Sequence, residues 1–206
     1  MLFFITIILL VVWFSMSRKR TSYLQEKKKE NFWEKESNAN HTRKTSLECL
    51  NYITIPLNLI ELAGSSTDSS IMEQGKILKQ LSNKKIVNLT GISNTDLKLK
   101  YGSSNLSSLT EYDQNFTQLA QTLNCIGLRF SELEDDSSAI LILEFSVSCK
   151  SDISSTYKQL AQLYVNVGQA EKIDSLIESA KTLNSLMKNT ILIHLEAIKK
   201  SSHALK

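Results

Sequence analysis

The residues of this chain that could do chemistry are few and widely spaced. Its three histidines, His41, His194 and His203, have no Cys, Asp or Glu at a spacing that would hold a metal ion. His194 and Glu196 are close along the chain but lie on different faces of a helix, so they form no ligand pair. No glycine-rich phosphate loop, nucleophile elbow or zinc-protease helix occurs. The sequence therefore predicts a protein that is not an enzyme and has no metal or cofactor site.

One cluster of acidic residues lies in the second half of the chain, at Glu132, Glu134, Asp135 and Asp136. Paired carboxylates can act as a general acid and base. Consecutive acidic residues between two helices are far more often a solvated loop and a negative start to the next helix, and we interpret the cluster in that way. The many serines have no base beside them in the sequence and are interpreted as linkers and helix caps.

The three cysteines, Cys49, Cys125 and Cys149, are an odd number in no metal-like spacing. Cys125 and Cys149 both fall in apolar stretches with helical patterning. We interpret the cysteines as small buried hydrophobic residues of a protein in a reducing compartment, in preference to a disulfide.

The composition favours long helices. A chain of 206 residues with one proline and six glycines has few helix breakers, which indicates an all-α fold. The formal net charge of +3 is concentrated just after the first apolar run. A nucleic-acid-binding domain would carry a basic stripe along its folded part, and no such stripe is visible, so no nucleic-acid partner is expected.

The apolar run Leu2–Met16 has three possible interpretations: a cleaved signal peptide, a membrane anchor or a buried core helix. Only one residue precedes the run and no small-x-small cleavage site follows it, which disfavours a signal peptide. The run is shorter than the roughly 20 residues that cross a hydrocarbon core, but long basic side chains after it can extend to the interface. We expect a transmembrane anchor at residues 1–17. The expected interface residues are Arg18, Lys19 and Arg20.

Basic residues next to a membrane segment are retained on the cytoplasmic side. The basic residues at 18–20 and 27–29 therefore predict a single-pass protein of the cell membrane with a cytoplasmic C-terminal domain. On that side of the membrane the N-x-S/T matches are chance occurrences and not glycan sites. These matches begin at Asn40, Asn88, Asn105 and Asn115.

Residues 18–66 are expected to form a charged juxtamembrane segment and a connection. Adjacent Phe32 and Trp33 interrupt the polar segment and are expected to pack onto the body of the domain, with a partner-binding hot spot as the alternative. In Leu47–Leu62, Pro56 disfavours a helix interior and indicates a loop or a short strand near Tyr52–Ile55.

Residues 67–206 are expected to form a helical domain. One helix should start after Thr67 or Asp68, and a second should cover Asn94–Tyr101, capped by Ser93 or Asn94 and ended by Gly102. A longer helix should then run from near Ser103 to Ile126. The segment Leu186–Lys200 should be a closing helix that buries Ile191, Leu195 and Ile198.

The most informative feature is an internal repeat at a constant offset. The residues Phe116, Gln118, Leu119, Ala120, Gln121 and Gly127 recur as Tyr157, Gln159, Leu160, Ala161, Gln162 and Gly168. A fixed period of this kind marks repeated helical units, each of which stacks on its neighbour to bury its apolar face.

The second copy resembles a tetratricopeptide repeat. The resemblance rests on Tyr157, Leu160, Ala161, Tyr164 and Gly168 in a first helix, and Ile177 and Ala180 in a second. It implies that small residues let two antiparallel helices approach closely, while the chain turns at Gly168. In the first copy, Ala139 and Leu143 fit the second helix if the connection between the helices is longer than usual. The resemblance covers about residues 107–200.

The stretch Asn31–Leu57 also resembles a block in uncharacterised single-pass proteins of Gram-positive bacteria, which implies no activity. The expected function is a membrane-anchored scaffold that contacts lipid through its N-terminal helix and binds a protein segment through its helical repeats. The alternatives are an enzyme or regulator of unfamiliar type with a cleft between the hairpins, or a structural subunit of a membrane complex.

Overall fold

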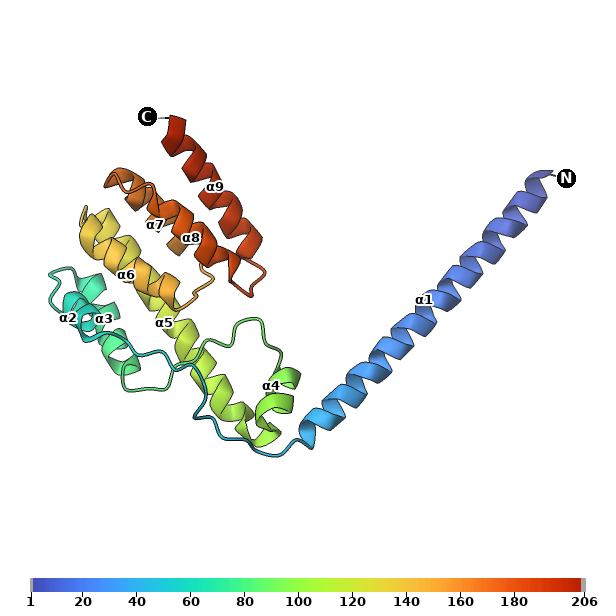
Figure 1. The fold of residues 1–206 in the computed structure, drawn as a ribbon. Helices are drawn as coiled ribbons and strands as arrows, with labels where there is room; N and C mark the ends of the chain where they lie inside the picture. The colour runs from blue at the N-terminus through green and yellow to red at the C-terminus, as the bar shows by residue number, and fades with distance from the viewer. Residues whose placement is uncertain (1, 205–206) are drawn as a thin grey trace. The chain divides into compact units, whose positions relative to one another are not determined.

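A computed structural model describes residues 2–204 of the chain. Within this range all regular structure is helical, apart from one isolated antiparallel bridge between Tyr52 and Val87 (Figure 1). The prediction of an all-α protein is confirmed. The helices are α1 (Leu2–Asn40), α2 (Leu57–Gly64), α3 (Ser69–Leu81), α4 (Asn94–Tyr101), the short 3-10 helix η1 (Ser103–Asn105), α5 (Leu106–Glu132), α6 (Asp136–Ser148), α7 (Ser154–Asn166), α8 (Lys172–Lys181) and α9 (Lys188–Ala204).

The chain divides into two compact units. Unit 1 consists of Met1–Leu47 and Ser93–Leu106, and unit 2 of Glu48–Ile92 and Ser107–Lys206. Unit 1 therefore contains α1, α4 and η1, and unit 2 contains α2, α3, α6 to α9 and nearly all of α5.

In unit 1, polar contacts hold the end of α1 against α4. The ammonium of Lys98 donates to the carboxylate of Glu36 and to the side-chain oxygen of Asn40. The Thr95 hydroxyl also donates to Glu36, at 2.7 Å. These contacts lower the pKa of Glu36, first through the hydrogen bond from Lys98 and then through the one from Thr95.

The transmembrane anchor expected at residues 1–17 is not found. No helix in the part of the chain that the structure describes is long and apolar enough to cross a membrane. Helix α1 has 39 residues, but its apolar part ends at Met16. At 1.5 Å per residue that part extends roughly 22 Å, short of a hydrocarbon core of about 30 Å. Met1, the first residue of the expected anchor, lies outside the described residues.

Phe32 and Trp33 on α1 are 52% and 59% exposed among the described residues, and their rings contact each other edge to face. Their packing onto the helical domain, which belongs to the other unit, stays a prediction.

Pro56 lies outside a helix interior, as expected, and Tyr52 forms the isolated bridge to Val87. Pro56 is the N-cap of α2, a position where a missing N–H costs nothing. The helix that begins directly after it was not predicted.

Unit 2 is a layered helical array around one hydrophobic core. Helix α2 packs on α3, and the consecutive helices α6, α7, α8 and α9 pack against one another (Figure 1). Close approach depends on residues with little or no side chain. A Cβ atom on Gly75 of α3 would lie 3.1 Å from the Cβ of Ala63 on α2, and one on Gly127 of α5 would lie 2.4 Å from Leu143 Cδ2 on α6.

Several helix ends follow the expected capping chemistry. Asp68 accepts hydrogen bonds from the amides of Ser70 and Ile71 and starts α3. Ser93 caps α4, and Gly102 ends it with a φ of 89°. The exposed ends of these helices therefore satisfy their backbone groups locally.

The acidic cluster is a turn and a helix start, as expected. Glu132 is the last residue of α5, and Asp135 is the N-cap of α6. The Asp135 carboxylate accepts a hydrogen bond from the Ser138 amide at 3.1 Å. Hydrogen bonding from Ser138 is the main cause of a pKa of Asp135 below its usual range.

The two glycines that recur in the repeat occupy different structural positions. Gly168 has a φ of 73° between α7 and α8, and the Gln169 amide donates to the Tyr164 carbonyl at 2.7 Å to close the helix end. Gly127 lies inside α5, which continues to Glu132. The longer connection expected in the first copy is thus mostly a continuation of α5 and not a loop.

Helix α9 closes the array much as expected. Ile191 and Leu195 are fully buried in the core, and Ile198 packs against it while partly buried. The cysteines differ from the expectation of burial. Cys149 is buried, whereas Cys49 and Cys125 are exposed.

Candidate functional site

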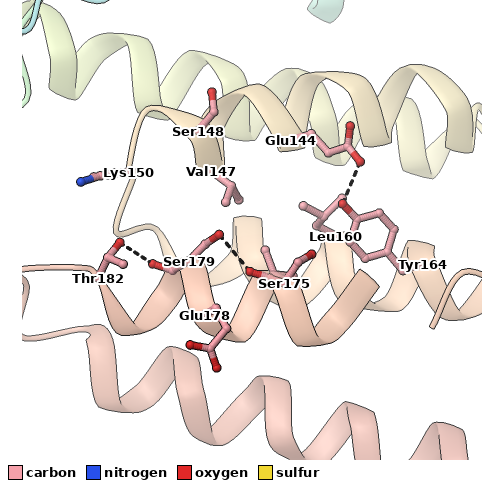
Figure 2. Close-up of a pocket in the computed structure, with 11 residues that line it drawn as sticks. Glu144, Val147, Ser148, Lys150, Leu160, Tyr164, Ser175, Glu178, Ser179 and Thr182 are labelled. Atoms are coloured by element: carbon pink, nitrogen blue, oxygen red, sulfur yellow. Dashed lines mark hydrogen bonds between the residues drawn. The ribbon is translucent and has the colours of Figure 1, made fainter. Parts of the chain in front are cut away.

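Helices α6, α7 and α8 enclose a groove of about 510 Å³ on unit 2 (Figure 2). We call it the main groove. Its apolar floor includes Val147 of α6, Leu160 of α7 and Leu176 of α8. The other lining residues are polar: Glu144, Ser148, Lys150, Tyr164, Ser175, Glu178, Ser179 and Thr182. An apolar floor with a polar edge is the usual composition of a binding site.

A ladder of hydroxyl groups forms the α8 edge of the main groove. Ser175 donates to the Lys172 carbonyl at 2.7 Å. Ser179 donates to the Ser175 carbonyl at 2.9 Å, and Thr182 to the Ser179 carbonyl at 2.8 Å (Figure 2). Because each hydroxyl proton is already donated to the backbone, each oxygen keeps lone pairs free to accept. This edge therefore presents hydrogen-bond acceptors to whatever occupies the groove.

A polar cluster between α6, α7 and the start of α8 lies at the end of the main groove that is away from Lys150 and Thr182 (Figure 2). The Tyr164 hydroxyl donates to Glu144 Oε1 at 2.8 Å, and Lys172 Nζ lies 3.4 Å from the same oxygen. The Lys172 ammonium also lies 5.2 Å from the centre of the Tyr164 ring. Burial, and secondly the hydrogen bond to Glu144, raise the pKa of Tyr164 above its usual range. Tyr164 thus remains a neutral donor at physiological pH.

Two neighbouring cavities adjoin the main groove through shared lining residues. Ser148, Lys150 and Thr182 line both the main groove and a second cavity of about 300 Å³. The second cavity shares five lining residues with a third of about 810 Å³. The shared residues are Thr90, Asp152, Leu183, Asn184 and Ser185. We call the three together the continuous groove. It follows α8 and then the turn between α8 and α9.

The loop at residues 88–91 builds one wall of the continuous groove. The side-chain amide of Asn88 donates to the carbonyls of Cys149 and Lys150, both at 3.0 Å. Gly91 has a φ of 79°, and a Cβ there would lie 2.2 Å from the Asn184 carbonyl oxygen. The loop can pack so closely on the α8–α9 turn only because residue 91 has no side chain.

Lys150 has an unusual backbone conformation at the junction of the first two cavities. Its φ is 57°, a left-handed value that disfavours residues other than glycine, asparagine and aspartate. The two hydrogen bonds from Asn88 hold this backbone, and the Lys150 side chain is exposed. In Figure 2, Lys150 lies at the same end of the main groove as Thr182, away from Glu144 and Tyr164.

The residues predicted from the repeat lie mostly in the core of unit 2. Leu160 and Tyr164 line the main groove. The others are buried in the core, except Gly168, which is exposed in its turn: Leu119, Ala120, Gly127, Ala139, Leu143, Tyr157, Ala161, Ile177 and Ala180. The predicted interface residues Arg18, Lys19 and Arg20 are exposed on α1.

The polar residues of the groove were not predicted from the sequence. Ser175, Ser179 and Thr182 are separated by one helical turn each, which is a signal for one helix face. That spacing could have been read from the sequence. The role of Lys150 could not be predicted in this way, because its position depends on Asn88, which is distant in the sequence.

Other arrangements of reactive side chains are less complete. Ser154 Oγ lies 3.2 Å from His194 Nδ1, a pair that the sequence does not reveal because the residues are 40 apart. No carboxylate within the described range hydrogen-bonds to the ring of His194, and neither residue lines the continuous groove. Nor do three His, Cys, Asp or Glu side chains gather as metal ligands within residues 2–204.

Comparisons with protein-family models, with curated proteins and with solved structures find no match to this chain.

Two buried tyrosines of α7 provide a matched test of the groove cluster. Tyr164 donates to Glu144, whereas the hydroxyl of fully buried Tyr157 has no hydrogen-bond partner among the described residues. We expect Tyr164→Phe to lower the free energy of unfolding by about 1 kcal/mol, because Glu144 loses a donor. Tyr157→Phe should leave it unchanged or raise it by up to about 1 kcal/mol, because an unsatisfied hydroxyl is removed. Denaturant unfolding of the full chain measures both.

Tyr157 also makes the stability of the native protein depend on pH. Burial raises the pKa of Tyr157, so above about pH 10 the unfolded tyrosine loses its proton while the folded one keeps it. The native protein should therefore lose stability as the pH rises past about 10, and less steeply in Tyr157→Phe. Two results together would contradict a buried, unpartnered Tyr157 hydroxyl. One is an equal loss of unfolding free energy in Tyr157→Phe and Tyr164→Phe at neutral pH. The other is a loss of stability above about pH 10 that is as steep in Tyr157→Phe as in the native chain.

Proposed function

We propose that this chain is a membrane-attached scaffold whose tetratricopeptide-like helical hairpins bind a segment of another protein. The observation that carries the proposal is the continuous groove along α6, α7 and α8, which is lined by an apolar floor and by hydrogen-bonding groups. A single cavity of about 510 Å³ would suit a small molecule equally well. The continuation through two further cavities favours a chain-like ligand.

The geometry of α7 and α8 supports the tetratricopeptide-like part of the proposal. The two helices are joined by a short turn at Gly168 and pack against each other. Ala161 and Ala180 are fully buried, and Leu160, Tyr164 and Ile177 belong to the same core cluster. In the first copy, Gly127 allows close contact between α5 and Leu143 of α6.

The N-terminal part of α1 supports membrane attachment. Large apolar side chains are exposed there at positions spread all round the helix, so they form no single face that one neighbouring helix could bury. Those with described side chains are Phe4, Ile5, Ile7, Leu10, Trp13, Phe14 and Met16. We propose that this segment inserts into lipid while Arg18, Lys19 and Arg20 contact the headgroups. We propose that the attachment is on the cytoplasmic side, where anionic lipids attract basic residues next to a membrane segment.

The groove can be tested with the full chain and a random dodecapeptide library displayed on phage. Ser175→Trp should fill the main groove with an indole and reduce the binding of enriched peptides at least tenfold. Ser201→Trp is the matched control, because both serines are exposed and both donate to a backbone carbonyl three residues earlier. A library that enriches nothing on the native chain, or peptides that bind both variants equally, would refute a groove-binding scaffold.

Membrane attachment can be tested by flotation with vesicles of phosphatidylcholine and phosphatidylglycerol. We expect the double substitution Ile7→Lys and Leu10→Lys to move the chain from the vesicle fraction to the soluble fraction. Each lysine placed in an apolar membrane segment costs about 2.5–3.5 kcal/mol. The control is Tyr23→Lys with Leu24→Lys, which changes two exposed large residues of α1 beyond the first basic cluster. Unchanged flotation of the first variant would contradict the proposal.

A further inference from the structure

The charges along the continuous groove are unevenly satisfied. Two of its carboxylates have cationic partners, because Glu144 lies beside Lys172 and Glu178 beside Lys181. Asp152 has no ion pair with a described residue and accepts from the neutral Ser185 hydroxyl at 2.5 Å. Two lining lysines, Lys150 and Lys188, also form no ion pair with any described residue. Unpaired positive charges therefore outnumber the unpaired carboxylate, and Lys150 is the one that lines two of the three cavities.

The position of this charge is set by the backbone. Asn88 holds the carbonyls of residues 149 and 150, which fixes Lys150 in its left-handed conformation. Glycine would adopt this conformation without strain. The ammonium is thus presented from a constrained backbone position between a hydroxyl-lined cavity and a cavity lined by amides. The amide-bearing residues are Asn51, Asn88 and Asn184.

The polar groups along the groove suit an extended chain. A peptide in extended conformation leaves its backbone N–H and C=O groups free to be satisfied by its binding site. The hydroxyl oxygens of Ser175, Ser179 and Thr182 can accept from such N–H groups. A helical ligand would already satisfy its own backbone and would use few of these acceptors.

We infer that the partner segment is an extended peptide with an aspartate or glutamate side chain that pairs with Lys150. This inference rests on the proposed function. In the bound peptide, the carboxylate lies at the junction of the first two cavities, and the backbone N–H groups donate to the hydroxyl oxygens along α8.

The inference can be tested with the full chain and two random dodecapeptide phage libraries that differ only in a central residue, fixed as Asp or as Asn. The native chain should enrich the Asp library at least tenfold over the Asn library. Lys150→Gly should abolish this preference, because glycine keeps the left-handed backbone and removes the charge. Lys150→Arg should retain it.

The matched control is Glu134→Gly. Glu134 is the other described non-glycine residue with a positive φ, at 61°, and it lies in the α5–α6 turn away from the groove lining. This variant should keep the preference for Asp. Equal enrichment of both libraries, still blocked by Ser175→Trp, would overturn the carboxylate inference and leave the groove proposal standing. No enrichment of either library would overturn both.

Discussion

The close approach of α5 and α6 at Gly127 is the constraint on which the rest of unit 2 depends. Leu143 projects from α6 into the space that a side chain at residue 127 would occupy. Interiors of proteins are close-packed, so a helix cannot move sideways by a methyl group without disturbing its neighbours. The contact fixes where α6 lies. Helix α7 packs on α6, and α8 and α9 pack on α7 and on each other around one shared core.

The groove follows from this arrangement. Glu144 is the residue after Leu143, so the same turn of α6 that packs on α5 also directs a carboxylate toward Tyr164 on α7. Helix α8 supplies the other edge, with Leu176 toward the floor and its hydroxyls bonded to their own backbone. Core packing and a polar binding surface thus come from opposite faces of the same short helices.

Local chemistry made part of this fold predictable. Asp68, Ser93 and Gly102 act at helix ends through hydrogen bonds to nearby backbone, so their effect is encoded within a few residues. The burial of Ile191 and Leu195 follows from helical periodicity in the same way. The repeat led to the α7–α8 hairpin because its period is a property of the sequence alone.

The errors come from features that depend on distant parts of the chain or on length. Cys125 lies in an apolar stretch, but it falls on the helix face opposite Leu123 and Ile126 and is exposed. The apolar start of α1 was interpreted as a transmembrane anchor from its composition, although it is too short to cross a membrane. Lys150 could not be recognised as a groove residue, because its position depends on a loop brought beside it by folding.

The most direct test is the free energy of unfolding of Gly127→Ala compared with Gly64→Ala. A Cβ at residue 127 would collide with the buried Leu143 side chain, whereas at residue 64, the last of α2, it would meet no atom within 4 Å. We predict a loss of about 1–3 kcal/mol for Gly127→Ala through overpacking, and a change within about 0.5 kcal/mol for Gly64→Ala. Two equally harmless substitutions would contradict the claim that this contact positions the helices that form the groove.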